Sequence, residues 1–195
     1  MVGLELIIDK LNISYDVICE VGVYSPETSQ IKNLILNSKK VIMIEPQTSR
    51  ANEIKNSFSH LDYVEVHNVA IHKENLDRVK LYCKNQAAFI EGLDSPEVVI
   101  KKYTPNEADA FYVVARTFDN YDDGSIDILA CDMEGAEWYV LKDLISRPKM
   151  ICLETHYNPP QYTNPFMREI NNWMSKNGYY EYCKDTSDTV YIKTK

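Results

Sequence analysis

Short apolar runs alternate with stretches of helical spacing along most of the 195-residue chain. Runs of this length suit buried strands, and strands that alternate with helices are typical of a mostly parallel sheet covered on both faces. The predicted strands are Tyr15–Val21, Val41–Ile44, Tyr63–Val66, Ile126–Cys131 and Met150–Glu154, and the predicted helices are Pro26–Asn37, Ser49–Ser57, Trp138–Ile145 and Pro165–Asn177. We therefore expect one α/β domain over residues 1–195, either alone or as part of a longer multidomain protein.

Two regions depart from this alternation. Tyr180–Cys183 and Thr189–Ile192 are joined by turn-forming residues and predict a closing hairpin. Val79–Cys83 and Phe111–Thr117 predict extended segments on either side of a weakly patterned insertion, Gln86–Asp109. Long insertions of this kind are commonly functional, so we expect this one to carry substrate specificity or a lid.

The composition excludes several classes of partner. The formal net charge is −8 and the chain has no basic run, so we expect no nucleic-acid partner. No apolar run approaches the length of a bilayer span and no signal peptide is visible, so we expect no membrane partner. The five cysteines are odd in number and four lie inside apolar runs, which favours buried free thiols and a cytoplasmic location. The absence of a CxxC pair disfavours a zinc site of the usual kind.

Three carboxylates follow the predicted strand Ile126–Cys131, in the segment Asp132-Met133-Glu134-Gly135-Ala136-Glu137. The carboxyl edge of an open α/β sheet is where ligands bind, so this cluster indicates chemistry. An alternative for Glu134 and Glu137 is a structural one, because acids in the first turn of a helix interact favourably with its dipole. Asp132, at the tip of the strand, is the strongest candidate for a functional role.

The next strand ends in Glu154, and His156 lies two residues further on. Asp132, Glu154 and His156 are candidate catalytic residues, since a carboxylate or a histidine near a substrate hydroxyl can act as a general base. Alternatively, Asp132, Glu134 and Glu154 could hold a divalent ion such as Mg²⁺. His156 could also be an ordinary hydrogen-bonded loop residue.

Candidate cofactor-binding residues follow the first three strands. Glu20 and Gly22 end the first strand, where a glycine lets backbone amides approach a ligand. A single glycine is too few for the G-x-G-x-x-G pattern, which disfavours NAD or FAD. Glu45 ends the second strand, where an acid can hold the hydroxyls of a ribose. Asn68 and Ala70 follow the third strand and could flank an adenine ring, although a core segment is the alternative.

This ordered set of motifs resembles the FkbM-type methyltransferases, over about Val17 to Glu154. The D-x-E-G-A-E block is the most specific element. The motifs in chain order are Glu20-Val21-Gly22, Glu45-Pro46, Asn68-Val69-Ala70, Arg116-Thr117-Phe118-Asp119, Ile126-Asp127-Ile128-Leu129, Asp132-Met133-Glu134-Gly135-Ala136-Glu137 and Leu153-Glu154. One departure lies in the first loop, where Val23 and Tyr24 stand in place of the small and polar residues of the family's aspartate–x–glycine–alanine–asparagine.

The resemblance implies a class I, S-adenosylmethionine-dependent methyltransferase fold, with a seven-stranded sheet and a closing antiparallel hairpin. It implies O-methylation, often of a sugar or a polyketide-type hydroxyl. The implied roles place Glu20 and Gly22 at the methionine half of the cofactor, Glu45 at the ribose, Asn68 and Ala70 near the adenine, and Asp132 closest to the transferred methyl.

A small-molecule or glycan acceptor is therefore expected, and three aromatic residues near the predicted cleft suit a saccharide. They are Tyr157, Tyr162 and Phe166, and the alternative for each is that it packs against the core or a helix face. Two alternatives remain open: a binding module that keeps the fold without turnover, and a metal-dependent hydrolase that uses the acid cluster.

Overall fold

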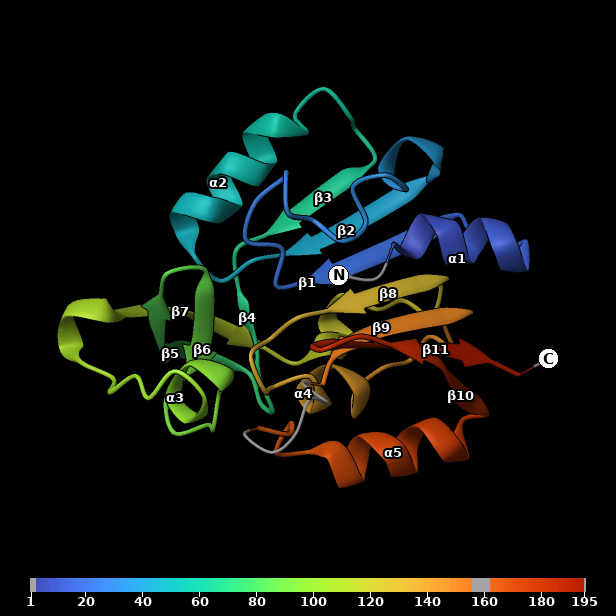
Figure 1. Cartoon of the computed structure of the whole chain (residues 1–195). Coiled ribbons are helices and arrows are strands. Elements are labelled where there is room, and N and C mark those ends of the chain that lie inside the picture. The colour runs from blue at the N-terminus through green and yellow to red at the C-terminus, as the bar shows by residue number, and fades with distance from the viewer. Residues whose placement is uncertain (1–2, 156–161, 195) are drawn as a thin grey trace.

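The structure is a computed structural model that describes residues 3–155 and 162–194 (Figure 1). Its main sheet has seven strands in the order β10-β11-β9-β8-β1-β2-β3, and only the pairings of β11 are antiparallel. The strands are β1 (Val17–Val21), β2 (Lys40–Ile44), β3 (Val64–His67), β8 (Ile128–Cys131), β9 (Met150–Glu154), β10 (Tyr179–Lys184) and β11 (Asp188–Lys193). The expected α/β class, the mostly parallel seven-stranded sheet and the closing hairpin are thus confirmed.

Each face of the main sheet is buried in a separate core, because successive side chains of a strand point to opposite faces. Ile18 and Ala130 belong to the core that α1 (Leu4–Leu11), the segment 25–37 and α2 (Thr48–Ser57) cover. Cys19 and Leu129 belong to the other core, under α4 (Trp138–Leu141) and α5 (Met167–Lys176). Near-continuous apolar strands are what this double burial requires.

A second, four-stranded sheet has the order β4-β7-β5-β6. Its strands are β4 (Ala70–Ile71), β5 (Leu76–Lys84), β6 (Ala87–Ile90) and β7 (Ala110–Arg116), and the short helices α3 (Pro96–Val99) and η2 (Glu107–Asp109) lie between β6 and β7. Figure 1 shows this sheet, in green, at the end of the main sheet toward which the arrows of β1 and β2 point. The insertion expected from the sequence therefore lies against the carboxyl edge of the main sheet.

The predicted helix Pro26–Asn37 is wrong. The segment forms turns and ends in the 3-10 turn η1 (Ile35–Asn37). Its backbone is drawn toward the sheet, because the Gln30 amide donates to Glu20 Oε1 at 2.7 Å and the Ser29 hydroxyl donates to Glu20 Oε2 at 2.5 Å. An amide that bonds a buried carboxylate is not available for a regular helical ladder.

The helix predicted over Trp138–Ile145 is shorter than expected and ends at Leu141. The amides of Ile145 and Ser146 donate instead to Asp122 Oδ2, both at 2.7 Å, which ties the chain here to the segment that precedes β8. No helix in the described part of the chain is long and apolar enough to cross a membrane. All five cysteines are free, as expected.

Candidate active site

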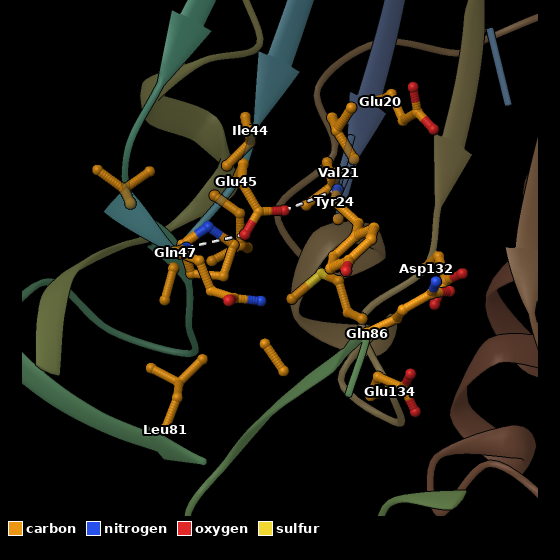
Figure 2. A pocket seen from close by; sticks show the side chains of 18 of the residues that line it. Glu20, Val21, Tyr24, Ile44, Glu45, Gln47, Leu81, Gln86, Asp132 and Glu134 are labelled. Carbon is orange, nitrogen blue, oxygen red and sulfur yellow. Dashed lines mark hydrogen bonds between the residues drawn. The ribbon is translucent and has the colours of Figure 1, made fainter. Parts of the chain in front are cut away.

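A cavity of about 240 Å³ lies between the carboxyl edge of the main sheet and the second sheet (Figure 2). One wall carries four carboxylates, and the other is mostly apolar. Lys, Arg and His are absent from the described residues that line it. The lining includes Glu20, Gly22, Tyr24, Glu45, Val69, Ala70, Ile71, Leu81, Gln86, Ala88, Ile90, Asp132 and Glu134. The structure thus brings together most of the site residues predicted from the sequence.

Glu20 lies at the end of β1 and is almost completely buried. Burial raises the pKa of its carboxyl to about 7, although the hydrogen bonds from Ser29 and Gln30 oppose this rise. The side chain therefore ties the loop over residues 25–37 to the sheet while it lines the cavity. Glu20 is protonated in a large fraction of molecules near neutral pH.

Glu20 gives the first testable prediction. In the folded protein its carboxyl keeps the proton up to about pH 7, whereas the unfolded chain releases it near pH 4.5. The folded state therefore binds more protons between these values, and the unfolding free energy falls as pH rises through this window. Glu20→Gln lacks this titration. From pH 4.5 to pH 7.5, its free energy of unfolding is therefore expected to rise relative to that of wild type by up to about 3 kcal/mol.

Urea unfolding at pH 4.5 and pH 7.5 measures this difference between the two proteins. Asp62→Asn is the control, since Asp62 is exposed in the turn before β3. The control is expected to follow the wild-type pH dependence. Parallel pH profiles for Glu20→Gln and wild type would contradict the prediction.

Glu45 follows β2 and is held by the backbone. Its Oε2 accepts from the Tyr24 amide at 2.9 Å and its Oε1 accepts from the Gln47 amide at 2.8 Å (Figure 2). Burial raises the pKa of this carboxyl, and these two hydrogen bonds oppose the rise. Each carboxylate oxygen keeps a second lone pair, so Glu45 can still accept hydrogen bonds from the two hydroxyls of a ligand.

Asn68 is not among the residues that line the cavity, whereas Ala70 is. Its amide Nδ2 donates to the carbonyl oxygens of Glu45 and Pro46 at 3.0 and 2.9 Å, and its Oδ1 accepts from Thr48 at 2.8 Å. The side chain thus holds the turn that positions Glu45. In this structure its contact with a ligand would be indirect, through that turn.

Gly22 joins the first loop to the acid cluster. It has a left-handed backbone (φ +85°), and a Cβ added there would lie 1.8 Å from the carbonyl oxygen of Asp132. Its amide donates to the Ile44 carbonyl at 2.9 Å, and the Asp132 amide donates to the Val21 carbonyl at 2.9 Å. Only a glycine lets the loops after β1 and β8 pass this closely.

Three carboxylates converge on the Asp132 side of the cavity. Asp132, Glu134 and Glu154 each offer an oxygen, and these oxygens lie within 4.8 Å of one another. A set of hard oxygen donors at this spacing could hold a divalent ion. The carboxyls of Asp132 and Glu154 also share a hydrogen bond.

Protons are shared unevenly in this group. Burial raises the pKa of Glu154 well above its usual range, and the negative charge of Asp132 raises it further. Burial also raises the pKa of Asp132, while its hydrogen bond with Glu154 lowers it. Of these two carboxyls, Glu154 therefore holds its proton more tightly. Burial raises the pKa of Glu134 to about 8, with the Asp132 charge as the next cause.

Glu137 has a structural role. Its side chain is fully buried, and its Oε1 accepts from the amides of Met133 at 2.7 Å and Gly135 at 3.3 Å. Its Oε2 accepts from the amide of Asn164 at the start of the α5 region. Glu137 therefore shapes the loop that presents Asp132 and Glu134, which have no comparable set of backbone partners among the described residues.

Other predicted site residues have different outcomes. His156 and Tyr157 lie outside the described residues. Tyr162 is buried and donates to the Asp94 carbonyl at 3.0 Å, and Phe166 packs against Tyr139 with ring centroids 5.4 Å apart. Both rings are thus packed against other residues of the protein, which is the structural alternative for them.

The second-sheet wall was not predicted from the sequence. Leu81, Gln86, Ala88 and Ile90 line the cavity from β5, β6 and the turn between them. The extended character of Val79–Cys83 predicted a strand there, but strand pairing between distant segments carries no local pattern. Tyr24 was also missed as a lining residue, although its place in the first loop marked it as unusual.

Comparisons with known proteins agree with this geometry. A family model described as the methyltransferase FkbM domain matches residues 16–180. No curated protein sequence matches the chain.

Three solved structures illustrate the shared fold. A candidate RNA methyltransferase from Pyrococcus horikoshii is 10% identical with a TM-score of 0.53, covering 98% of this chain and 79% of its own. A candidate methylase from Haemophilus influenzae is 16% identical with a TM-score of 0.52, covering 100% and 89%. A candidate caffeoyl-CoA O-methyltransferase from Staphylococcus aureus is 14% identical with a TM-score of 0.52, covering 98% and 81%.

Proposed function

Because this chain belongs to the methyltransferase FkbM domain family, we propose that it transfers a methyl group from S-adenosylmethionine to a hydroxyl of a sugar or glycan. The observation that supports this proposal best is the cavity itself. Four carboxylates and no basic side chain line it in the described part of the chain, opposite an apolar wall. Such a lining suits a cation with hydroxyls and a flat apolar ring, which are the features of an adenosyl sulfonium.

The same lining disfavours ligands with phosphates. A nucleotide phosphate in this cavity would meet the acidic side chains of Glu45 and Asp132, and no basic side chain among the described lining residues would offset their charge. The cavity is therefore expected to reject NAD and ATP. The apolar side chains of Ala70, Ile71 and Leu81 would enclose the adenine, and Glu45 would accept hydrogen bonds from the ribose.

The reaction we propose uses Asp132 as the general base. When bound, the cofactor supplies an electrophilic methyl group. Asp132 accepts the proton of the acceptor hydroxyl, and the freed oxygen lone pair forms the new bond to carbon as the carbon–sulfur bond breaks. Burial raises the pKa of Asp132, which brings its basicity closer to neutral pH, as general-base catalysis requires. Correct alignment of the reacting groups by the loops can lower the activation barrier by roughly 7–11 kcal/mol.

Ligand binding tests the proposal. S-adenosylhomocysteine is expected to bind with micromolar affinity by calorimetry, and ATP and NAD are expected not to bind. Glu45→Gln is expected to lower the affinity for S-adenosylhomocysteine by about tenfold or more, since hydrogen bonds to a charged group are worth about 1.5–3 kcal/mol. Glu65→Gln is the matched control, because Glu65 is exposed on the neighbouring strand β3.

Activity separates the alternatives. Transfer of labelled methyl to neutral glycosides supports the enzyme, and binding of S-adenosylhomocysteine without transfer to any hydroxyl acceptor favours a module without turnover. Absence of binding would contradict the proposal. Loss of transfer on addition of EDTA, restored by Mg²⁺, would show that activity requires a metal and would favour Asp132, Glu134 and Glu154 as its ligands, and insensitivity to EDTA would reject that role.

A further inference from the structure

Tyr24 has an unusual backbone conformation at the cavity. Its φ is +57°, in the left-handed region that bulky residues rarely adopt. Glu134, with φ +54°, is the other non-glycine lining residue with a positive φ. Strained residues of this kind persist only where the surrounding structure holds them, and they gather at functional sites.

Contacts fix Tyr24 at both ends. Its amide donates to Glu45 Oε2 at 2.9 Å, and its hydroxyl accepts from Arg50 Nη2 at 2.6 Å. The guanidinium carbon of Arg50 also lies 4.2 Å from the centre of the Tyr24 ring. Glu53 holds Arg50 in turn, through a 2.8 Å ion pair. The ring is therefore oriented before any ligand arrives.

The ring borders the cavity and Arg50 does not. Tyr24 lines the cavity together with Glu45 and Asp132, whereas Arg50 on α2 is outside the lining. In the view of Figure 2 the ring projects between Glu45 and Asp132. The ring therefore lines the same cavity as the residue assigned to the ribose and the residue assigned to the methyl group, which is the region where the proposed function puts the sulfonium.

We propose that Tyr24 binds the positive sulfonium through its ring, so that the pocket holds the charged cofactor more tightly than the neutral product. This inference rests on the proposed function. The face of an aromatic ring attracts a cation and has little preference for a neutral thioether. Arg50 is a positioning residue that keeps the ring in place from outside the cavity.

The test measures affinity for S-adenosylmethionine and for S-adenosylhomocysteine by calorimetry, in wild type and variants. Tyr24→Leu is expected to lower the affinity for S-adenosylmethionine by about fivefold or more and the affinity for S-adenosylhomocysteine by less than twofold. Leucine is also bulky and keeps the backbone penalty at φ +57°, so the comparison isolates the ring. Tyr24→Phe, which retains the ring, is expected to keep the wild-type ratio of the two affinities.

Tyr112→Leu is the matched control. Tyr112 lies on β7, is 47% exposed and has its own arginine, Arg78, with the guanidinium carbon 3.7 Å from the ring centre. It does not line the cavity. This variant is expected to leave both affinities unchanged.

Arg50→Gln tests the positioning role and is expected to lower the affinity ratio without abolishing binding. If Tyr24→Leu weakens the binding of both ligands equally, the ring has no preference for charge and the inference is overturned. The inference is also overturned if Tyr24→Leu changes neither affinity. If wild type binds neither ligand, the proposed function itself fails. If wild type binds both ligands and Tyr24→Leu leaves the ratio of the two affinities unaltered, only the inference about Tyr24 fails.

Discussion

Asp132→Asn is expected to reduce kcat for methyl transfer by about a hundredfold or more, the usual contribution of a positioned general base. Asparagine has a similar shape, but it cannot take the proton of the acceptor hydroxyl. The backbone of Asp132 still donates to the Val21 carbonyl, so the loop itself is expected to remain in place. Steady-state kinetics with saturating cofactor and a neutral glycoside acceptor measure the effect.

Asp143→Asn provides the comparison for this experiment. Asp143 follows α4, and its carboxylate pairs with Lys142 at 2.5 Å rather than facing the cavity. We expect the kcat of Asp143→Asn to stay within twofold of the wild-type value. Binding of S-adenosylhomocysteine by Asp132→Asn would show that the site is intact. A kcat for Asp132→Asn above one third of the wild-type value would remove Asp132 from the chemistry.

Gly22→Ala is expected to destabilise the protein by roughly 3–5 kcal/mol or to prevent folding, because it combines a left-handed backbone with overpacking. The added Cβ would lie 1.8 Å from the carbonyl oxygen of Asp132 and 2.8 Å from its carbonyl carbon. Both are backbone atoms, so relief requires β1 and β8 to separate at their carboxyl ends. Urea unfolding at pH 7 gives the change in free energy.

Gly92→Ala separates the two causes. Gly92 has a similar φ of +83°, but a Cβ there would meet nothing within 4 Å. Its expected cost is that of the backbone alone, about 1–2 kcal/mol. If Gly22→Ala and Gly92→Ala cost the same, the close approach of the Gly22 loop to Asp132 has no energetic weight.

The parallel strands could be predicted because double burial leaves a pattern in the sequence. The meeting of Asp132 and Glu154 also followed from the sequence. They end the neighbouring strands β8 and β9, and the register pairs Cys131 with Leu153, which brings the next residues level. In such cases the local pattern and the sheet topology give the same answer.

Other features depended on contacts between distant residues. The segment 26–37 has helical spacing, and Ile31, Leu34 and Ile35 are buried as that spacing predicts. The buried carboxylate of Glu20 nevertheless takes the Gln30 amide, and no local propensity reports a partner ten residues away. Likewise, β5 pairs with β7 across the insertion, so the placement of the local β5–β6 hairpin in the second sheet depends on non-local pairing.

The two sides of the cavity are encoded separately along the chain. The carboxylates come from the end of β1 and from the segments after β2 and β8, whereas four residues of the opposite wall, Leu81, Gln86, Ala88 and Ile90, fall within one stretch, residues 76–90. Evolution can therefore exchange or remodel that single stretch while it leaves the acidic loops untouched. A chimera that grafts a relative's hairpin onto this scaffold would follow the same route in the laboratory.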